Sequence, residues 1–504
     1  MTKGKQAEIR SLPSGVPGLD IVLGGGLPEF SFNLIAGGPG SGKTTLAHQI
    51  MFANATVARP ALYFTVLGEP ALKMLRYQRQ FSFFDPDFAG SAIQFVNLST
   101  EVMEQDLGQV LQRIIGEIER VSPGIVVVDS FRTIGGRRDR AEKGNTSELE
   151  NFVQRLALHL TSWEVTSFLL GEYAEEEQRS PVFTVADGIL WLTQATDRNS
   201  VVRKLQVVKV RGRATMPGLH TFKISGDGLQ IFPRIPEQTT KRVRQQGGRL
   251  STGVPGLDEM IGGGIVSGDA VLLTGPAGSG KSTIATQFMA TGLANGETGV
   301  IAIFEEYPEE YLARAGKRNP VIAKMIKAGK LELIYLRPLD LSVDEALAAI
   351  LEAVERLGAN RVVIDSLSGF EVALAPTFRV DFRESFYRLV GTLTAVGVTV
   401  FMTAEVVEGF SDVRFTTEKV SFITDEIIIQ RYIEIEGELK RVMAVIKMRG
   451  SKHSHELRMY EVTPKGVVVG DALTEYDCII TGNPFVRTAP VGAVARPPAK
   501  RRGR

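Results

Sequence analysis

The chain contains the same glycine-rich motif twice, and this repeat constrains its fold more than any other feature. Residues 37–44 read GGPGSGKT and residues 275–282 read GPAGSGKS, so both follow the pattern G-x-x-x-x-G-K-[ST]. Lys43 and Lys281 lie 238 positions apart, and the hexapeptide GVPGLD recurs at 15–20 and 253–258 with the same offset. A chain of 504 residues has room for two ordinary domains. The repeat therefore predicts a tandem duplication of one whole domain.

Each copy is expected to fold as an α/β domain. Short apolar runs precede the two loops at 34–36 and 271–274, and helices are expected after them at 45–52 and 283–289. Continuous runs of β-branched residues at 125–128 and 362–364 are typical of parallel strands that are buried on both faces. Later segments, such as 424–429 followed by 441–446, indicate antiparallel pairing. These patterns predict a mostly parallel central sheet flanked by helices in each copy.

The same patterns divide the chain into four parts. We expect a first domain at 1–240, a linker at 241–248, a second domain at 249–475 and a disordered tail at 476–504. The tail is rich in Pro, Ala and Arg and has little to bury. It is interpreted either as a solvated end or as a basic arm that contacts an acidic partner.

Composition and charge exclude several classes of protein. The single cysteine, Cys478, forms no internal disulfide, and the first residues lack the apolar core of a signal peptide, so a cytoplasmic protein is expected. The longest apolar stretch, 390–407, contains Gly, Thr and Glu405 and is interpreted as a helix end, a turn and a strand rather than a membrane span. The net charge is +1, but residues 483–504 hold six basic residues and no acidic one, which leaves the rest at −5. DNA is therefore not expected as a partner.

The two glycine-rich loops predict nucleotide binding. Successive backbone N–H groups of such a loop point at phosphate oxygens, the lysine reaches the β- and γ-phosphates, and the following helix adds the positive end of its dipole. A chance glycine-rich turn is the alternative, but two matches in register argue against it. The residues expected to contact ATP in the loops are Gly37, Gly38, Pro39, Gly40, Ser41, Gly42, Lys43, Thr44 and Thr45 in the first copy, and Gly275, Pro276, Ala277, Gly278, Ser279, Gly280, Lys281, Ser282 and Thr283 in the second.

A magnesium site is expected beside each loop. The hydroxyls of Thr44 and Ser282 are placed to hold Mg²⁺, and Asp129 and Asp365 each end an apolar strand, where a carboxylate supports the metal's ligand shell. An aspartate that only caps a helix is the alternative for both positions.

A pair of glutamates distinguishes the second copy from the first. Glu305 and Glu306 follow an apolar strand, and carboxylates at this place can polarise a nucleophile beside the γ-phosphate. We therefore interpret Glu305, Glu306 and Asp365 as catalytic, with Glu306 also a candidate metal ligand. The first copy has Leu67 and Gly68 at the matching positions, with Glu69 one residue late. A solvated loop pair is the alternative for the glutamates.

Two cations recur late in each copy, in Lys209-Val210-Arg211 and Lys447-Met448-Arg449. In ring-shaped ATPases such cations reach the nucleotide of the neighbouring subunit. An ordinary charged strand edge is the alternative. The second copy adds Ser451 and His453 to the residues expected to contact ATP.

These residues resemble the KaiC family of tandem RecA-like P-loop ATPases over residues 10–475. The resemblance depends on the twin loops, the two GVPGLD hexapeptides, the Glu305-Glu306 pair, the run from 423 to 439 and the segment KMRGS at 447–451. It implies a double-ring homohexamer with ATP and Mg²⁺ between subunits, ATPase activity, autophosphorylation in the second ring and a KaiB-like protein partner.

The family's phosphorylation segment is only partly present. An adjacent Ser-Thr pair precedes Ile-Thr-Asp in the family, whereas this chain has Ser421 followed by Phe422. The resemblance implies Ser421 as the phosphoacceptor, with Thr416 as a further one, and the alternative is that Ser421 is a loop hydroxyl.

Two other classes of function stay open. One is a DNA-dependent RecA-like ATPase of the recombinase or helicase type, which stimulation by single-stranded DNA would distinguish. The other is a nucleotide-loaded signalling scaffold with little turnover, which variants of Glu305 and Glu306 would distinguish.

Overall fold

The structure is a computed structural model of the chain. It describes residues 10–65, 71–99, 107–129, 146–173, 181–197, 200–234, 248–336, 341–379, 382–406, 424–474, 476–477 and 485–486. The chain divides into two compact units, Met1–Pro236 and Glu237–Arg504, each of which is described by itself. The expected linker lies outside the described residues apart from Gly248.

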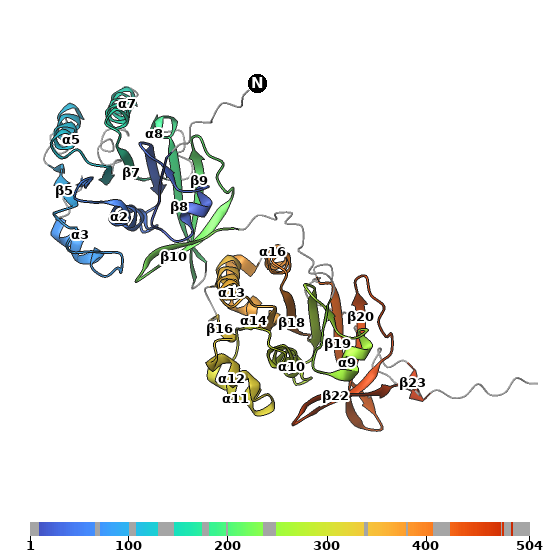
Figure 1. The fold of residues 1–504 in the computed structure, drawn as a ribbon. Coiled ribbons are helices and arrows are strands. Elements are labelled where there is room, and N and C mark those ends of the chain that lie inside the picture. Colours follow the sequence, from blue (N-terminus) through green and yellow to red (C-terminus); the bar gives the residue numbers. More distant parts are fainter. Residues whose placement is uncertain are drawn as a thin grey trace, which may run out of the picture. The chain divides into compact units, whose positions relative to one another are not determined.

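A nine-stranded sheet forms the centre of the first unit within its described residues, in the order β11-β10-β9-β8-β3-β7-β6-β4-β5 (Figure 1). The strands from β8 to β5 are parallel, and β8 to β11 form an antiparallel extension. The strands are β3 (Phe32–Gly37), β4 (Ala61–Thr65), β5 (Ile93–Asn97), β6 (Ile125–Asp129), β7 (Thr166–Glu172), β8 (Gly188–Asp197), β9 (Ser200–Val210), β10 (Leu219–Ser225) and β11 (Gly228–Phe232), with β1 (Ser11–Leu12) and β2 (Leu27–Pro28) paired apart.

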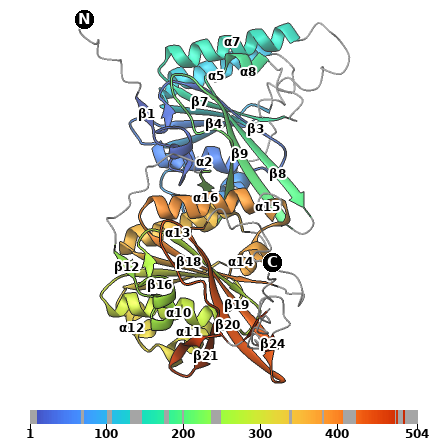
Figure 2. The same cartoon turned by 90° about the vertical axis from the view of Figure 1, so that its right-hand side faces the viewer.

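Helices cover both faces of this sheet. Figure 2 shows α5, α7 and α8 on one face and α2 on the other. The helices are α1 (Leu19–Val22), α2 (Lys43–Asn54), α3 (Ala71–Gln78), α5 (Leu107–Val121), α7 (Thr146–Ser162) and α8 (Pro181–Val185). Strand β6 supplies both cores, because Val127 packs in the cluster under α2 whereas Val126 and Val128 pack in the cluster under α5 and α7. Successive residues of a strand point to opposite faces, so a strand covered on both sides is apolar throughout.

The second unit repeats this plan. Its sheet has the order β16-β15-β17-β18-β14-β19-β20-β21-β22, again parallel except for the last strands. The strands are β14 (Ala270–Gly275), β15 (Gly299–Ile303), β16 (Leu331–Tyr335), β17 (Arg361–Asp365), β18 (Thr399–Glu405), β19 (Glu426–Ile435), β20 (Glu438–Met448), β21 (Arg458–Thr463) and β22 (Gly466–Ala472), with β12 (Arg249–Leu250) and β13 (Ile265–Val266) paired apart. The prediction of two tandem α/β domains with a mostly parallel central sheet is confirmed.

The helices of the second unit also lie on both sides of its sheet, with α13 and α16 on one side and α10 to α12 on the other (Figure 2). They are α9 (Pro255–Met260), α10 (Lys281–Ala294), α11 (Pro308–Arg318), α12 (Val321–Lys327), α13 (Val343–Leu357), α14 (Leu367–Ala373), α15 (Pro376–Arg379) and α16 (Phe382–Ala395).

Helix α13 illustrates how the sequence sets these elements. Ser342 caps its first turn by accepting a hydrogen bond from the Glu345 N–H at 3.1 Å, and Gly358 ends it in the left-handed conformation with φ 59°. The buried positions recur at helical spacing and are Val343, Ala346, Leu347, Ile350, Ala353 and Val354.

The longest apolar stretch divides as predicted between the end of α16 and β18. No helix among the described residues is long and apolar enough to cross a membrane. The tail differs from its expectation at its start, where β23 (Tyr476–Asp477) pairs with β24 (Phe485–Val486). Tyr476 packs against a small cluster around Ile433, which explains why this part is ordered. Residues 487–504 lie outside the described residues.

Candidate nucleotide-binding and catalytic sites

Each glycine-rich loop joins the central strand of its sheet to a helix, β3 to α2 and β14 to α10. Gly42 and Gly280, the last loop residues, have φ 99° and 97°, a left-handed conformation that favours glycine. A Cβ atom on Gly42 would also lie only 2.7 Å from the Ile224 side chain. The tight turn therefore requires glycine, and it leaves the backbone N–H groups at the start of the helix available to an anion.

The loop lysines fold back onto their own loops. Lys43 Nζ donates to the carbonyls of Gly37 at 3.0 Å and Gly38 at 2.8 Å, and Lys281 Nζ donates to Gly275 and Pro276, both at 2.8 Å. These carbonyls hold each ammonium group inside the loop, where the P-loop pattern places the β- and γ-phosphates. Thr45 and Thr283 lie in the first helical turns. The intervening residues Pro39, Gly40, Ser41, Ala277, Gly278 and Ser279 form the loops themselves.

Carboxylates surround each lysine. Burial lowers the pKa of the Lys43 ammonium, and the charges of Glu172 and Asp129 oppose this. Burial likewise lowers the pKa of Lys281, opposed by Glu405, Asp365 and Glu305. The lysines lack full hydration, so a phosphate that enters the loop meets a poorly solvated cation.

Glu172 and Glu405 were missed as site residues by sequence reasoning. They end β7 and β18 and pair in register with Gly37 and Gly275, the last residues of the loop strands. A glutamate that ends a buried strand was a visible signal, but its place beside the loop depends on the order of strands in the sheet.

The residues expected to support magnesium do lie together. Thr44 Oγ1 donates to Asp129 Oδ2 at 2.9 Å, and Ser282 Oγ donates to Asp365 Oδ1 at 3.1 Å. Hydroxyl and carboxylate oxygens suit Mg²⁺, which usually keeps waters and phosphates among its ligands. Among the described residues, no group of three or more His, Cys, Asp or Glu side chains forms a self-sufficient metal site. The donor set therefore fits a magnesium ion that arrives with a nucleotide.

Neighbouring protein groups shield the Asp365 carboxylate from solvent. Burial raises its pKa, while hydrogen bonds from Thr403 and Ser282 and the charges of Arg314 and Lys281 lower it. Bound Mg²⁺ would add a further charge that favours the ionised form.

Glu305 lies at the carboxyl edge of the second sheet, two residues beyond β15. Its Oε1 accepts a hydrogen bond from the Oγ of Ser366, the residue after Asp365, at 2.9 Å. The carboxylate packs over Gly369, where a Cβ atom would lie 2.4 Å from Oε1. Glu305 is exposed to solvent, so a water molecule or a hydroxyl can reach it.

Glu306 has a different partner from Glu305. Arg314 of α11 holds it with two hydrogen bonds, from Nε at 3.2 Å and from a terminal nitrogen at 2.5 Å. These bonds raise the pKa of the Arg314 guanidinium, which also lies 5.0 Å over the ring of Tyr311. The two adjacent glutamates therefore have distinct environments.

The recurring cations of each copy lie at the end of the sheet opposite its glycine-rich loop. Lys209 Nζ donates to Ala186 O at 2.5 Å, and Arg211 pairs with Asp187 at 2.9 Å, next to Phe32 at the start of β3. In the second unit Lys447 Nζ donates to Thr424 O at 2.6 Å, and Arg449 pairs with Asp425 at 3.2 Å.

In the first copy, the glycine-rich loop follows the other end of β3, after Gly37. Six residues of strand span about 17–20 Å. Lys209, Val210 and Arg211 are therefore remote from the loop of their own copy, as are Lys447, Met448 and Arg449. Ser451 accepts a hydrogen bond from Arg249 at 3.0 Å, and the His453 ring lies 4.6 Å from that of His455.

Several predicted residues fall outside the described part of the chain. They are Leu67, Gly68 and Glu69 of the first copy and Thr416 and Ser421 of the second. Their roles stay predictions.

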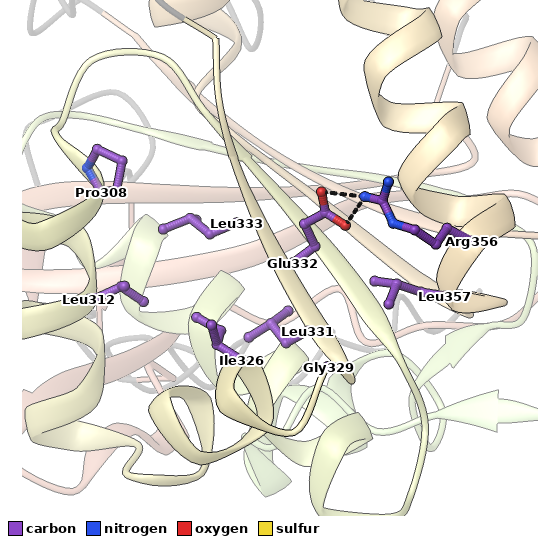
Figure 3. Close-up of a pocket in the computed structure, with 9 residues that line it drawn as sticks. All are labelled: Pro308, Leu312, Ile326, Gly329, Leu331, Glu332, Leu333, Arg356 and Leu357. Carbon is purple, nitrogen blue, oxygen red and sulfur yellow. Dashed lines mark hydrogen bonds and ion pairs between the residues drawn. The ribbon is translucent and has the colours of Figure 1, made fainter.

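A surface groove of about 690 Å³ lies apart from the loop, at the edge strand β16 (Figure 3). Leu312, Ile326, Leu331 and Leu333 contribute to its apolar lining, and Arg356 crosses one end to pair with Glu332. β16 is separated from the loop strand β14 by three strands of the sheet. None of the predicted site residues lines this groove.

Two glycine-rich loops, each after the central strand of a mostly parallel sheet and beside a strand-end aspartate, define a tandem P-loop protein of the RecA-like class. The KaiC ATPase family model matches the chain twice, at residues 12–235 and 250–474. The chain belongs to the KaiC family.

Curated relatives align with nearly the whole chain. The "Circadian clock oscillator protein KaiC" of Thermostichus vulcanus is 27% identical over 494 residues, which cover 96% of this chain and 93% of the relative. The protein of that name from a Picosynechococcus species is 28% identical over 501 residues, with the same coverage. "Circadian clock oscillator protein KaiC 1" of a Synechocystis species is 27% identical over 495 residues, covering 94% and 92%.

Proposed function

We propose that the chain is an ATP-hydrolysing, KaiC-like homohexamer in which the second copy performs the chemistry and the first copy binds nucleotide chiefly to hold the assembly together. ATP with Mg²⁺ is the proposed cofactor of both copies. The observation that most supports a working second site is the position of Glu305, which is exposed and lies in the electrostatic surroundings of Lys281. The alternatives of a DNA-dependent ATPase and of a scaffold with little turnover have no comparable support among the described contacts.

In the proposed reaction Glu305 accepts a proton from the attacking water. A general base needs to be accessible and able to accept a hydrogen bond, and Glu305 meets both conditions whereas Glu306 is held by Arg314. Lys281 binds the transferred phosphoryl group, and Asp365 with Ser282 would hold Mg²⁺, which neutralises phosphate charge when bound.

Replacing Glu305 tests this assignment. Glu305→Gln keeps the size and an acceptor oxygen but loses the base, so steady-state ATP turnover should fall by about 10²–10⁴-fold. Glu306→Gln should lower turnover less, and Glu69→Gln should change it little. Glu310→Gln is the matched control, since Glu310 is an exposed carboxylate in the first turn of α11. Undiminished turnover in Glu305→Gln, or a loss of most turnover in Glu69→Gln, would assign hydrolysis to another residue or to the first copy.

The separation of cations and loops within one copy supports a ring. Arg211 and Arg449 cannot reach the loop of their own copy, yet both are largely exposed at 61% and 52% of their side chains. In a head-to-tail ring the cation edge of one subunit faces the loop edge of the next, so each nucleotide obtains a cation from its neighbour.

We also propose that the second copy phosphorylates Ser421, with Thr416 as a minor acceptor. The segment that carries them connects β18 to β19, and both strands flank the loop strand β14. Glu305 would accept the hydroxyl proton, while the γ-phosphoryl group passes from ATP to Ser421 Oγ and leaves ADP.

Phosphate mapping tests the autokinase proposal. After incubation with γ-labelled ATP, one major phosphosite per subunit is expected, at Ser421. Ser421→Ala should abolish most of the label while ATP turnover remains. Label that persists in this variant would place the acceptor elsewhere, and an unlabelled wild-type protein would leave the ATPase function alone.

The relatives are circadian clock oscillator proteins by name, and this motivates a last part of the proposal, a timing or signalling role with a KaiB-like protein partner. Phosphorylation of the chain that stays constant over days in its native cells would argue against a timing role.

A further inference from the structure

The strand-end aspartate of each copy accepts a second hydrogen bond in addition to the one from the loop hydroxyl. In the first copy Tyr63 OH donates to Asp129 Oδ2 at 2.5 Å, and in the second Thr403 Oγ1 donates to Asp365 Oδ1 at 2.6 Å. In both cases the donor shares its acceptor oxygen with the loop Thr or Ser. Two donors on one oxygen fix the rotation of the carboxylate.

The two copies obtain this hydroxyl from opposite neighbouring strands. Tyr63 lies on β4, on one side of the aspartate strand β6, whereas Thr403 lies on β18, on the other side of the aspartate strand β17. The matching positions are apolar: Leu170 pairs in register with Asp129 where Thr403 stands in the second copy, and Ile301 replaces Tyr63. The duplication has therefore kept the hydrogen bond while changing the residue that makes it.

Packing holds the Tyr63 ring in place. Its side chain is fully buried, 4.6 Å from the ring of His48 and 5.6 Å from that of Phe95. His48 is buried as well, and burial lowers the pKa of its imidazole to about 4, so it is neutral at physiological pH. A rigid, uncharged environment aims the phenol at Asp129 with little loss of rotamer entropy.

We propose that Tyr63 is a positioning residue of the first nucleotide site, where it orients Asp129 toward the magnesium of bound nucleotide, as Thr403 orients Asp365 in the second site. This inference depends on the proposed binding of Mg²⁺ and ATP by both copies. Residues that orient a metal's ligands typically contribute 10–100-fold to metal affinity.

The test measures metal-dependent binding without hydrolysis. In the full chain, Lys281→Ala restricts tight binding to the first site, and a fluorescent non-hydrolysable ATP analogue is titrated with MgCl₂. Tyr63→Phe, which removes only the hydroxyl, should raise the Mg²⁺ concentration for half-maximal binding by about tenfold or more. Analogue binding in EDTA should stay unchanged, because the Tyr63 hydroxyl donates to Asp129 and would act on binding through the metal.

A second substitution that supplies a hydroxyl from the other neighbouring strand should restore the affinity for Mg²⁺. Adding Leu170→Thr to Tyr63→Phe gives the first copy the donor that the second copy uses, so the Mg²⁺ requirement should return toward that of the parent protein. Leu170→Thr alone controls for the loss of a buried leucine. Should the double variant not fold, the second site offers the same comparison in a Lys43→Ala background, where Thr403→Val should raise the Mg²⁺ requirement and Thr403→Ser should not.

The outcomes distinguish a failure of the role proposed for Tyr63 from a failure of the proposed nucleotide binding at the first site. An unchanged Mg²⁺ requirement in Tyr63→Phe, or equal weakening with Mg²⁺ and with EDTA, means that Tyr63 only packs, and overturns the inference. Binding at the first site that persists when Lys43→Ala is added to Lys281→Ala would instead contradict the proposed nucleotide site.

Discussion

At the scale of single residues, the site depends on pairs whose members lie far apart in the chain. Tyr63 meets Asp129, Thr403 meets Asp365, and Glu305 meets Ser366 only because parallel strands end at a common edge. The glutamate pair shows the same principle, since two neighbours with identical side chains acquire different partners from different elements.

A buried glutamate gives the second unit a pH-dependent stability. Burial raises the pKa of Glu426 to about 7, assisted by the charges of Asp269 and Asp425 and opposed by the Val266 N–H and Arg249. In the unfolded chain the carboxyl ionises near its ordinary value of 4.5. Between these values the folded state binds the extra proton, so the free energy of unfolding falls as pH rises from about 4.5 to 7.

Glu426→Gln should remove this slope. The amide keeps an acceptor for the Val266 N–H but does not ionise, so above pH 7 the variant should be more stable than wild type by up to about 3 kcal/mol. Thermal unfolding at pH 5 and pH 8 is the measurement, and wild type should lose more Tm than the variant. Parallel pH dependence of Tm in the two proteins would show that Glu426 is not the titrating group.

At the scale of elements, helix α11 follows the proposed catalytic glutamates and supports one of them. It begins with Pro308, two residues after Glu306, and its buried Tyr311 supports Arg314, which holds Glu306. The expected helix at 283–289 was placed correctly but began two residues late, because Lys281 and Ser282 already belong to α10. Loop glycines that look like breakers in sequence become the left-handed cap of the helix.

Replacing Arg314 of α11 should remove the ion pair that holds Glu306 and lower ATP turnover. Arg314→Met frees Glu306 beside Glu305 and the phosphates, and the extra negative charge should lower ATP turnover by about tenfold, in the range seen when a supporting residue is lost. The free energy of unfolding should change by only about 1 kcal/mol, because the pair is partly exposed.

Arg356→Met is the matched control for Arg314→Met. Arg356 also holds a glutamate, Glu332, at 2.5 Å, but at the groove beside β16 (Figure 3). Because Arg356 is exposed, its replacement should change stability little, and it should leave turnover intact. Equal losses of turnover in both variants would mean that the Arg314–Glu306 pair has no specific effect on ATP turnover.

At the scale of the whole molecule, the two copies share the same glycine-rich loop, but different residues surround the loop in each copy. The first site has Tyr63 beside its aspartate, and the second has Thr403, Glu305 and the Arg314–Glu306 pair. We therefore expect unequal contributions of the two copies to assembly and to turnover.

Assembly should require ATP. Because ligand that binds only the assembled state stabilises it, light scattering after size exclusion should show a hexamer with ATP and Mg²⁺ and smaller species without them. Lys43→Ala should impair assembly more than Lys281→Ala does. Arg211→Ala should weaken the ring at little cost to folding, since Arg211 is mostly exposed. A monomer at micromolar concentration in saturating ATP and Mg²⁺ would contradict the ring.

The sequence by itself determined the duplication, the α/β class of each copy, the nucleotide loops and the aspartates beside them. These features are local: glycine spacing, runs of β-branched residues and a polar residue at a strand end report on structure within a few positions. The start of α10 and the order at Tyr476 were misjudged by a few residues, where capping and packing decide the outcome.

Only the tertiary structure decided which side chains share a site. Glu172, Glu405, Tyr63 and Thr403 each lie in an apolar strand, and nothing in their local sequence tells which strand will be the neighbour. Strand order sets Tyr63 against Asp129 from one side and Thr403 against Asp365 from the other. It also separates Arg211 from the loop of its own copy, because β9 runs antiparallel and returns the chain to the opposite edge. Such relations depend on contacts distant in sequence, which only the packed sheet establishes.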